Sequence, residues 1–206
     1  CIYSDTLQTF RLAAEGKTPG RRPPPHLRER IATHFDPLPF WSPPLEDAFV
    51  DRARYPLAAI TQRPMAMYHS WDSQNAWLRQ IHSHNYLFAH PSAASAAGVA
   101  DGGWCWVESR WGRVRCMLRT SEAVEPGTVW TWNAIGKADG AWQLAPGADE
   151  ARKGFLLNHL ITDELPGDGG AVSNSDPVTG QAGWYDVRVR IAPCGAGEDA
   201  ETSPQF

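Results

Sequence analysis

The chain has 206 residues, 42% of them hydrophobic, which is enough for one domain with a sizeable core. Its 19 basic and 23 acidic side chains give a formal net charge of -4, so nothing attracts it over long range to nucleic acid or anionic lipid. No apolar run approaches the roughly 20 residues that would span a bilayer. We therefore expect neither nucleic-acid binding nor direct membrane insertion.

The chain opens with an amphipathic pattern. Leu7, Phe10 and Ala14 share one face of residues 4–14, which predicts a helix there. The first residue is Cys1, with neither an initiator Met nor a signal-like segment, so we expect an internal fragment of a longer protein.

Two proline-rich stretches follow. Residues 18–26 (TPGRRPPPH) and 35–44 (FDPLPFWSPP) predict extended segments, because proline fixes φ and lacks a donor. The aromatic residues in the second stretch suggest that it lies on an apolar surface. We expect residues 1–54 to form a strap with one helix, which links to upstream domains.

Short strands dominate the rest of the chain. Six segments are rich in β-branched and aromatic residues and are separated by Gly, Pro or Asp, which predicts a mainly β barrel or sandwich with short helices. These segments are residues 56–62, 85–90, 104–109, 114–120, 127–133 and 184–191. Short helices are expected at residues 72–81, 91–97 and 149–161, and residues 192–206 are expected to form a mobile tail.

The strands at 104–109 and 114–120 are expected to form a hairpin, with Gly112 at a positive φ in the turn. Cys105 and Cys116 would then face each other. A disulfide is possible there, but two buried thiols are favoured. The four cysteines contain no CxxC pair, so neither a zinc ribbon nor an iron-sulfur ligand set is encoded in this chain.

Common nucleotide and metal motifs are missing. There is no GxGxxG, and Gly136 lacks the context of a phosphate-binding P-loop. His82 and His84 form an HxH pair with His90 nearby in the sequence. No third ligand is placed to converge with the pair on a metal ion, so no metal role is assigned. Trp130, Trp132 and Trp142 are candidates for a carbohydrate-stacking platform, although packing roles are favoured for them.

Residues 61–70 (TQRPMAMYHS) concentrate hydrogen-bond donors and one cation at a predicted strand-to-helix turn. Such a turn suits a diphosphate or a pterin, because a helix N-terminus offers unpaired N–H groups and an arginine offers bidentate charge. Taken alone, the segment is better explained as an ordinary polar loop. The polar residues are Thr61, Gln62, Arg63, Tyr68, His69 and Ser70.

A resemblance to a known family runs from about Tyr55 to Ile191. Five blocks in order carry it: TQRPMAMYHS, HPSAASAAGVADGGWCWVESRWGRV, EPGTVW, NHLI and DPVTGQAGWYDVRVRI. They resemble the C-terminal dinucleotide-binding domain of the dimethyl sulfoxide reductase superfamily. The resemblance implies a six-stranded double-psi β-barrel over residues 55–191.

It also implies a ligand, molybdopterin guanine dinucleotide, wrapped by the loop at residues 61–70. Gln62 stands where the family commonly has glycine, which puts one close backbone contact in doubt. The implied cofactor-binding residues are Thr61, Gln62, Arg63, Met67, Tyr68, His69, Ser70, Asn158, Gln181 and Tyr185. The molybdenum or tungsten, its amino-acid ligand and the catalytic residues would belong to upstream domains, so the chain is not expected to be active alone.

Further phrases, including VWTWNAIGK and SNSDPVTGQAGWYDVRV, resemble the superfamily's catalytic subunits that act on sulfur compounds. The resemblance implies sulfite oxidation, with reduction of polysulfide, thiosulfate or tetrathionate as the alternative. It also implies two partners, an iron-sulfur electron-transfer subunit plus a membrane anchor subunit, with a peripheral location on the cytoplasmic side of the inner membrane. A tryptophan-platform carbohydrate module is the alternative from a different class.

Overall fold

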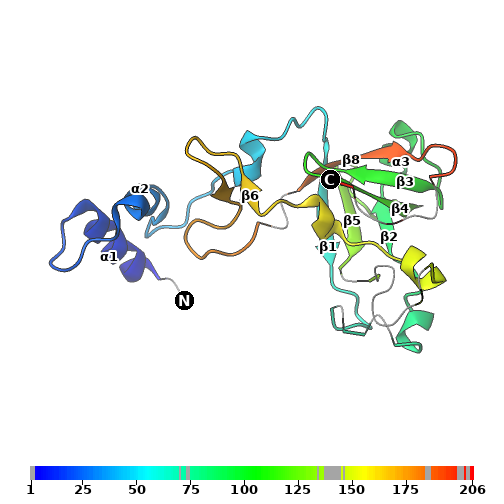
Figure 1. The fold of residues 1–206 in the computed structure, drawn as a ribbon, viewed down its shortest axis with the longest axis horizontal. Coiled ribbons are helices and arrows are strands. Elements are labelled where there is room, and N and C mark those ends of the chain that lie inside the picture. The colour runs from blue at the N-terminus through cyan, green and yellow to red at the C-terminus, as the bar shows by residue number, and fades with distance from the viewer. Residues whose placement is uncertain are drawn as a thin grey trace.

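The computed structural model is elongated, with a helical N-terminal part and a β-barrel at opposite ends (Figure 1). Helices α1 (Ser4–Glu15) and α2 (Pro25–His34) lie together at one end, and strands β6 (Glu164–Leu165) and β7 (Val172–Ser173) form a small sheet between them and the barrel. The structure describes residues 3–69, 71–72, 75–133, 135–136, 145, 147–183, 187–198, 202 and 205–206.

Six strands close into a barrel in the order β1-β5-β2-β4-β3-β8. The β1–β5 and β2–β4 pairs are parallel and the other neighbours are antiparallel. The predicted six-stranded barrel is therefore confirmed, and the sandwich alternative is wrong. The strands are β1 (Leu57–Gln62), β2 (Tyr86–Ala89), β3 (Trp104–Glu108), β4 (Arg113–Thr120), β5 (Thr128–Trp132) and β8 (Arg188–Pro193).

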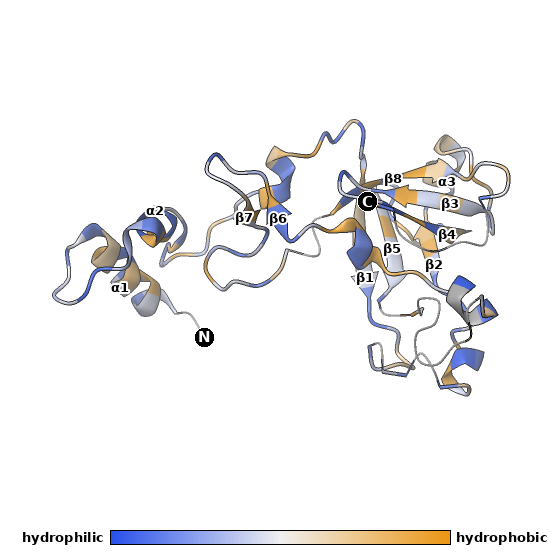
Figure 2. Cartoon of the chain, in the orientation of Figure 1, coloured by the Kyte–Doolittle hydropathy of each residue, from blue (hydrophilic) through white to orange (hydrophobic). Residues whose placement is uncertain are grey.

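The barrel core follows the two-residue period of its strands. Leu87 and Ala89 of β2 and Val129 of β5 are fully buried, whereas the residues between them are half-buried on the outer face. Hydrophobic colour recurs along β2, β3, β4 and β8 in Figure 2. Full burial of a side chain such as Leu87 contributes about 1.5–3 kcal/mol, so this interior supplies much of the stability.

The β3–β4 hairpin forms as predicted, and Cys105 pairs with Cys116 across it. Both thiols are buried and free, with their Sγ atoms 3.9 Å apart, so the favoured interpretation of buried thiols is confirmed. Burial raises the pKa of the Cys116 thiol well above its usual range. The predicted positive φ at Gly112 is wrong. Glycine is needed there because a Cβ would lie 2.9 Å from the Gln205 carbonyl oxygen.

Two predicted helices are wrong in extent. Residues 72–81 contain only a short 3-10 helix, η2 (Leu78–Gln80), among their described residues. The side chain of Asn75 accepts bonds from the backbone of Trp77 and Leu78, which competes with helical hydrogen bonding. Helix α3 (Pro91–Ala96) forms as predicted, with proline at its start and Gly98 at a φ of 69° after its end.

Residues 149–161 form two 3-10 helices, η4 (Asp149–Arg152) and η5 (Leu157–Leu160), rather than one α-helix. The carbonyls of Lys153 and Phe155 between them accept hydrogen bonds from Asn85. A continuous helix would have used those carbonyls internally.

The N-terminal region contains the predicted helix α1 and a second helix, α2, which the sequence did not predict. Pro25 occupies the first turn of α2, where the missing N–H costs nothing, so the extended prediction for residues 18–26 is wrong at its end. Residues 35–44 have no regular structure, as predicted, and Phe40 and Trp41 remain exposed among the described residues. The 3-10 helix η1 (Leu45–Ala48) then leads to the barrel.

The segment after β8 contacts the barrel surface. Trp106 donates from Nε1 to the Glu198 carboxylate at 3.1 Å, and its ring carries Arg113 and Arg115 within 4.0 and 4.6 Å of its centroid. Gln205 pairs with Arg113 through both backbone groups. Hydrogen bonds from the Gly195 backbone and then from Trp106 hold the pKa of Glu198 below its usual value.

Candidate functional site

The barrel interior changes from apolar to polar where β1 and β5 end together. Their parallel register pairs Ala59 with Val129 in the core and then Thr61 with Thr131, before the strands end at Gln62 and Trp132. Residues in register on neighbouring strands point to the same face, so the threonine pair forms a polar layer above the aliphatic one. This polar end positions the loop that follows β1.

Asn85 holds the polar end together. Its side-chain amide donates to the carbonyls of Trp132 at 2.9 Å and Phe155 at 3.0 Å, and its Oδ1 accepts from the Thr131 hydroxyl at 2.8 Å. Its backbone N–H donates to the carbonyl of Lys153 at 2.7 Å. One buried side chain therefore fixes the start of β2, the end of β5 and the segment between η4 and η5.

Two glycines let that segment pass over the end of β5. A Cβ on Gly154 would lie 2.3 Å from the Gly136 Cα and 2.5 Å from the Ile135 carbonyl oxygen. Gly136 also has a φ of 136°, which side chains rarely adopt. Ile135 and Phe155 beside the crossing are buried, so the polar end is covered on this side.

Two polar atoms at the same end lack a partner. The Thr61 Oγ1 and the Asn133 Oδ1 are buried without a hydrogen bond to any described residue. A buried unsatisfied group costs about 1–3 kcal/mol, so native structures usually pair such groups with protein, ordered water or a ligand. The barrel end thus has unused capacity for hydrogen bonds.

The loop after β1 projects from this end, below the barrel in Figure 1. Arg63 is exposed, with no ion pair or hydrogen bond to a described residue, while Pro64 beside it is fully buried. Met67 is 4% exposed, so its side chain packs in the interior. Tyr68 is 63% exposed. The loop therefore anchors itself with two apolar residues and presents a cation and a phenol.

His69 is the described non-glycine residue with a positive φ, 51°. Such a conformation is uncommon outside glycine, and observed outliers of this kind cluster at functional sites. The turn is held by Asp72, whose carboxylate accepts from the Tyr68 N–H at 2.8 Å. The rings of Tyr68 and His69 meet edge to face at 5.1 Å. Ser70, also predicted here, lies outside the described residues.

Asn158 and Gln181 lie on other segments. Asn158 is exposed on η5, which packs on the hairpin turn through a 2.8 Å bond from the Ser109 hydroxyl to the Leu160 carbonyl. No hydrogen bond or ion pair among the described residues joins the loop after β1 to Asn158 or Gln181, and Tyr185 lies outside those residues.

Gln181 lines a cavity of about 710 Å³ between residues 174–183 and the strap. Trp41 of the strap lines the same cavity. Burial alone would raise the pKa of Asp176, but hydrogen bonds from Thr179 and Val178 lower it overall, which stabilises the loop around a charged carboxylate. The strap and this loop thus form one surface, and none of the described residues of the polar barrel end lines its cavity.

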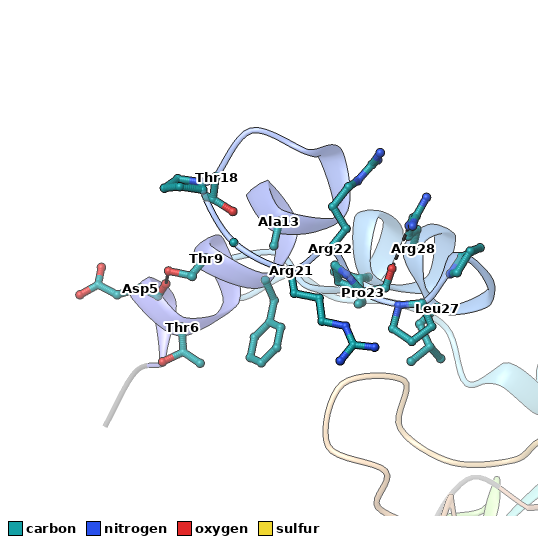
Figure 3. A pocket seen from close by; sticks show the side chains of 16 residues that line it. Asp5, Thr6, Thr9, Ala13, Thr18, Arg21, Arg22, Pro23, Leu27 and Arg28 are labelled. Atoms are coloured by element: carbon teal, nitrogen blue, oxygen red, sulfur yellow. Dashed lines mark hydrogen bonds between the residues drawn. The ribbon is translucent and has the colours of Figure 1, made fainter.

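A larger cavity of about 1000 Å³ lies between α1 and α2 (Figure 3). Its arginines are partly engaged, since Arg22 donates to the Ala14 carbonyl and Arg28 to the Pro23 carbonyl. None of the predicted site residues lines it. It belongs to the helical end of the molecule.

The tryptophan-platform alternative can be judged from the outer face of β2 and β5. Phe88 and Trp130 stack face to face at 4.0 Å with a 9° interplanar angle, and Trp132 meets Trp130 edge to face at 4.8 Å. These rings pack on one another. Trp142, the third platform residue, lies outside the described residues.

The three histidines considered for a metal site make ring contacts or hydrogen bonds with neighbouring residues. The His82 ring lies 5.3 Å from Trp132, His84 stacks on Tyr86 at 5.7 Å, and His90 accepts from the Ser92 N–H at the start of α3. Within the described residues, no group of three or more His, Cys, Asp or Glu side chains is arranged to hold a metal ion. No described helix is long and apolar enough to cross a membrane.

Sequence reasoning missed Asn85 and Asn133. Both flank predicted strands, at the start of NYLFAH and the end of GTVWTWN, and a polar residue at a strand boundary carried no further signal. The importance of Asn85 depends on partners more than 40 residues away, Trp132 and Phe155.

The sequence that forms most of the barrel matches a known class of domain. The model of the molydopterin dinucleotide binding domain family matches residues 57–173, more than half of the chain. The chain therefore belongs to this family, which confirms the resemblance predicted from the sequence.

Among particular relatives, a subunit of sulfite dehydrogenase from Allochromatium vinosum is 70% identical over 207 residues, covering 100% of this chain and 21% of that protein. Dopamine dehydroxylase of Eggerthella lenta is 27% identical over 151 residues, covering 70% of this chain and 14% of that protein. The chain thus spans about a fifth or less of the length of these relatives.

A solved structure of acetylene hydratase from Pelobacter acetylenicus superposes with a TM-score of 0.57 and 23% identity, covering 79% of this chain and 22% of that one. This similarity supports the fold of the barrel.

Proposed function

We propose that this domain binds molybdopterin guanine dinucleotide in the catalytic subunit of a molybdenum oxidoreductase. The observation that carries the proposal is the polar barrel end, where unpartnered hydrogen-bonding atoms adjoin an exposed arginine on the following loop. Membership in the dinucleotide-binding family supports it. The residues present fit the ligand, which carries a charged diphosphate and a heterocyclic edge with donors and acceptors.

Each polar residue of the loop after β1 suits one part of that ligand. Arg63 pairs with the diphosphate, because a guanidinium offers parallel N–H bonds to phosphate oxygens. Tyr68, His69 and Ser70 donate hydrogen bonds to the diphosphate or pterin. Met67 supports the loop from within, since its side chain is buried.

The amide residues suit the pterin. Asn158 and Gln181 each carry one acceptor and two donors, which a pterin edge can match, and Tyr185 is assigned to the same wall. The segments that carry Asn158 and Gln181 are not linked to the loop after β1 by described hydrogen bonds, so the ligand itself would bridge them.

The bound group supplies the redox chemistry, with its metal held by other domains of the parent protein. This chain's part is to bind, orient and electrostatically tune it. Similarity to the sulfite dehydrogenase of Allochromatium vinosum supports sulfite as the substrate, which loses two electrons and gains an oxygen derived from water. An iron-sulfur subunit to accept the electrons, a membrane anchor subunit, and a cytoplasmic site at the inner membrane complete the proposal.

Cofactor content tests the proposal directly. Acid iodine treatment converts the bound pterin to a fluorescent oxidised form, which is expected from the intact parent protein together with released GMP. An Arg63→Ala parent is expected to carry less of both, because the diphosphate loses its cation. A parent protein that yields no pterin contradicts the proposal and favours the carbohydrate module.

A further inference from the structure

The two unpartnered atoms at the polar barrel end belong to Thr61 and Asn133. We propose that these side chains bind the heterocyclic edge of the dinucleotide, which makes Asn133 a further cofactor-binding residue. The inference rests on the proposed function and adds to it a residue and the part of the ligand that it contacts.

Strand register and one backbone hydrogen bond place both residues at the same end of the barrel. Thr61 pairs with the fully buried Thr131, and the Asn133 N–H donates to the Gln62 carbonyl at 2.7 Å, one step beyond the last strand pair. Asn133 directly follows the last residue of β5, and this hydrogen bond keeps its backbone beside the end of β1. Thr61 and Asn133 therefore lie at the same end of two adjoining segments.

The neighbouring polar side chains already have hydrogen-bond partners, which distinguishes them from Thr61 and Asn133. The Thr131 hydroxyl donates to the Asn85 Oδ1, and the Asn85 amide donates to two backbone carbonyls. Within the same polar layer, Thr61 Oγ1 and Asn133 Oδ1 have no described partner. The fold thus satisfies one threonine-asparagine pair internally and leaves the other for something else to satisfy.

The chemistry of the free atoms selects the part of the ligand. An amide oxygen only accepts, so the partner of Asn133 Oδ1 must present an N–H or O–H group. An ionised diphosphate has no such donor. The fused rings of pterin and guanine present ring N–H and amino groups, and the nucleotide sugar adds hydroxyls. The Thr61 hydroxyl can donate to or accept from the same edge. Arg63, close by in sequence and exposed, is left for the diphosphate.

Isosteric substitutions in the 206-residue chain without cofactor give the first test. Thr61→Val and Asn133→Leu remove an unsatisfied polar group, so the denaturant midpoint should stay the same or rise. Thr131→Val is the matched control at the paired position, and it should lower the midpoint because it leaves Asn85 without its donor. The inference is overturned if Thr61→Val or Asn133→Leu lowers the denaturant midpoint as much as Thr131→Val does. Such a result would mean that water already forms hydrogen bonds with the Thr61 and Asn133 side chains.

Cofactor content of the intact parent protein gives the second test. Asn133→Leu should reduce pterin retained after gel filtration roughly tenfold, the effect of one lost buried hydrogen bond. Thr128→Val is the control, because its hydroxyl bonds Glu125 away from the polar end, and it should retain the wild-type amount. Wild-type retention by Asn133→Leu overturns this inference alone, while a wild-type protein without pterin overturns the proposed function itself.

Pterin and GMP should fall together in Asn133→Leu, because the two halves of the dinucleotide are covalently joined and are retained or lost as one molecule.

Discussion

Gly136 and Gly154 cross so closely that neither can carry a side chain. A Cβ on Gly154 would lie 2.3 Å from the Cα of Gly136, which is far inside van der Waals contact. The crossing brings the segment between η4 and η5 over the end of β5, where Asn85 binds it. This contact therefore connects the barrel to the segment that leads to Asn158.

Gly154→Ala should destabilise the chain by at least about 2 kcal/mol, because the new methyl group meets backbone that cannot turn away. The measurement is the free energy of unfolding in denaturant. Gly169→Ala is the control, since a Cβ there meets no heavy atom within 4 Å, and it should be close to neutral. Equal effects from the two substitutions would contradict the crossing.

Asn85→Ala should lower the free energy of unfolding by about 2–4 kcal/mol. The substitution leaves the carbonyls of Trp132 and Phe155 and the Thr131 hydroxyl without their Asn85 partner in a buried layer. Hydrogen exchange should show faster opening at the end of β5 and in residues 153–155. A loss of stability with unchanged exchange in those segments would argue against this role for Asn85.

His84 should make stability depend on pH below neutrality. Burial, and then the charge of Lys153, lowers the pKa of His84 from its usual value of 6.5. The unfolded chain therefore binds the proton first, so stability is complete above about pH 6.5 and falls as pH drops through the lower folded pKa. His84→Gln should reduce this slope in thermal melts recorded at successive pH values.

Burial also lowers the pKa of His159, so His84→Gln/His159→Gln should flatten the profile further. A His84→Gln profile with the wild-type slope would show that protonation of this ring is not linked to folding.

His69→Gln should shift the midpoint potential of the intact parent enzyme, because it removes a titratable ring from the strained turn proposed to face the cofactor. Potentiometric titration at two pH values measures the shift, and pterin content confirms equal loading. His26→Gln, on the distant helix α2, is the control. An unshifted midpoint would place His69 away from the pterin.

Patterns of neighbouring residues were sufficient to predict much of the fold. Alternating β-branched and aromatic residues located the strands of the barrel, and Pro91 with Gly98 located α3, because strand period and helix caps are properties of neighbouring residues. The helix over 149–161 was wrong for the opposite reason. Its apolar residues fit a helical face, but Asn85, more than 60 residues earlier, takes the carbonyls that the helix would need.

The sequence by itself determined a strand-rich domain, a polar loop after its first strand and, through resemblance, the barrel and the family to which the chain belongs. Only the tertiary structure decided which polar side chains remain available. Thr61 and Thr131 are the same residue type in paired positions, yet one is satisfied by Asn85 and the other is not. Hydrogen-bond satisfaction depends on partners that are distant in sequence, and closure of the barrel is what brings them together.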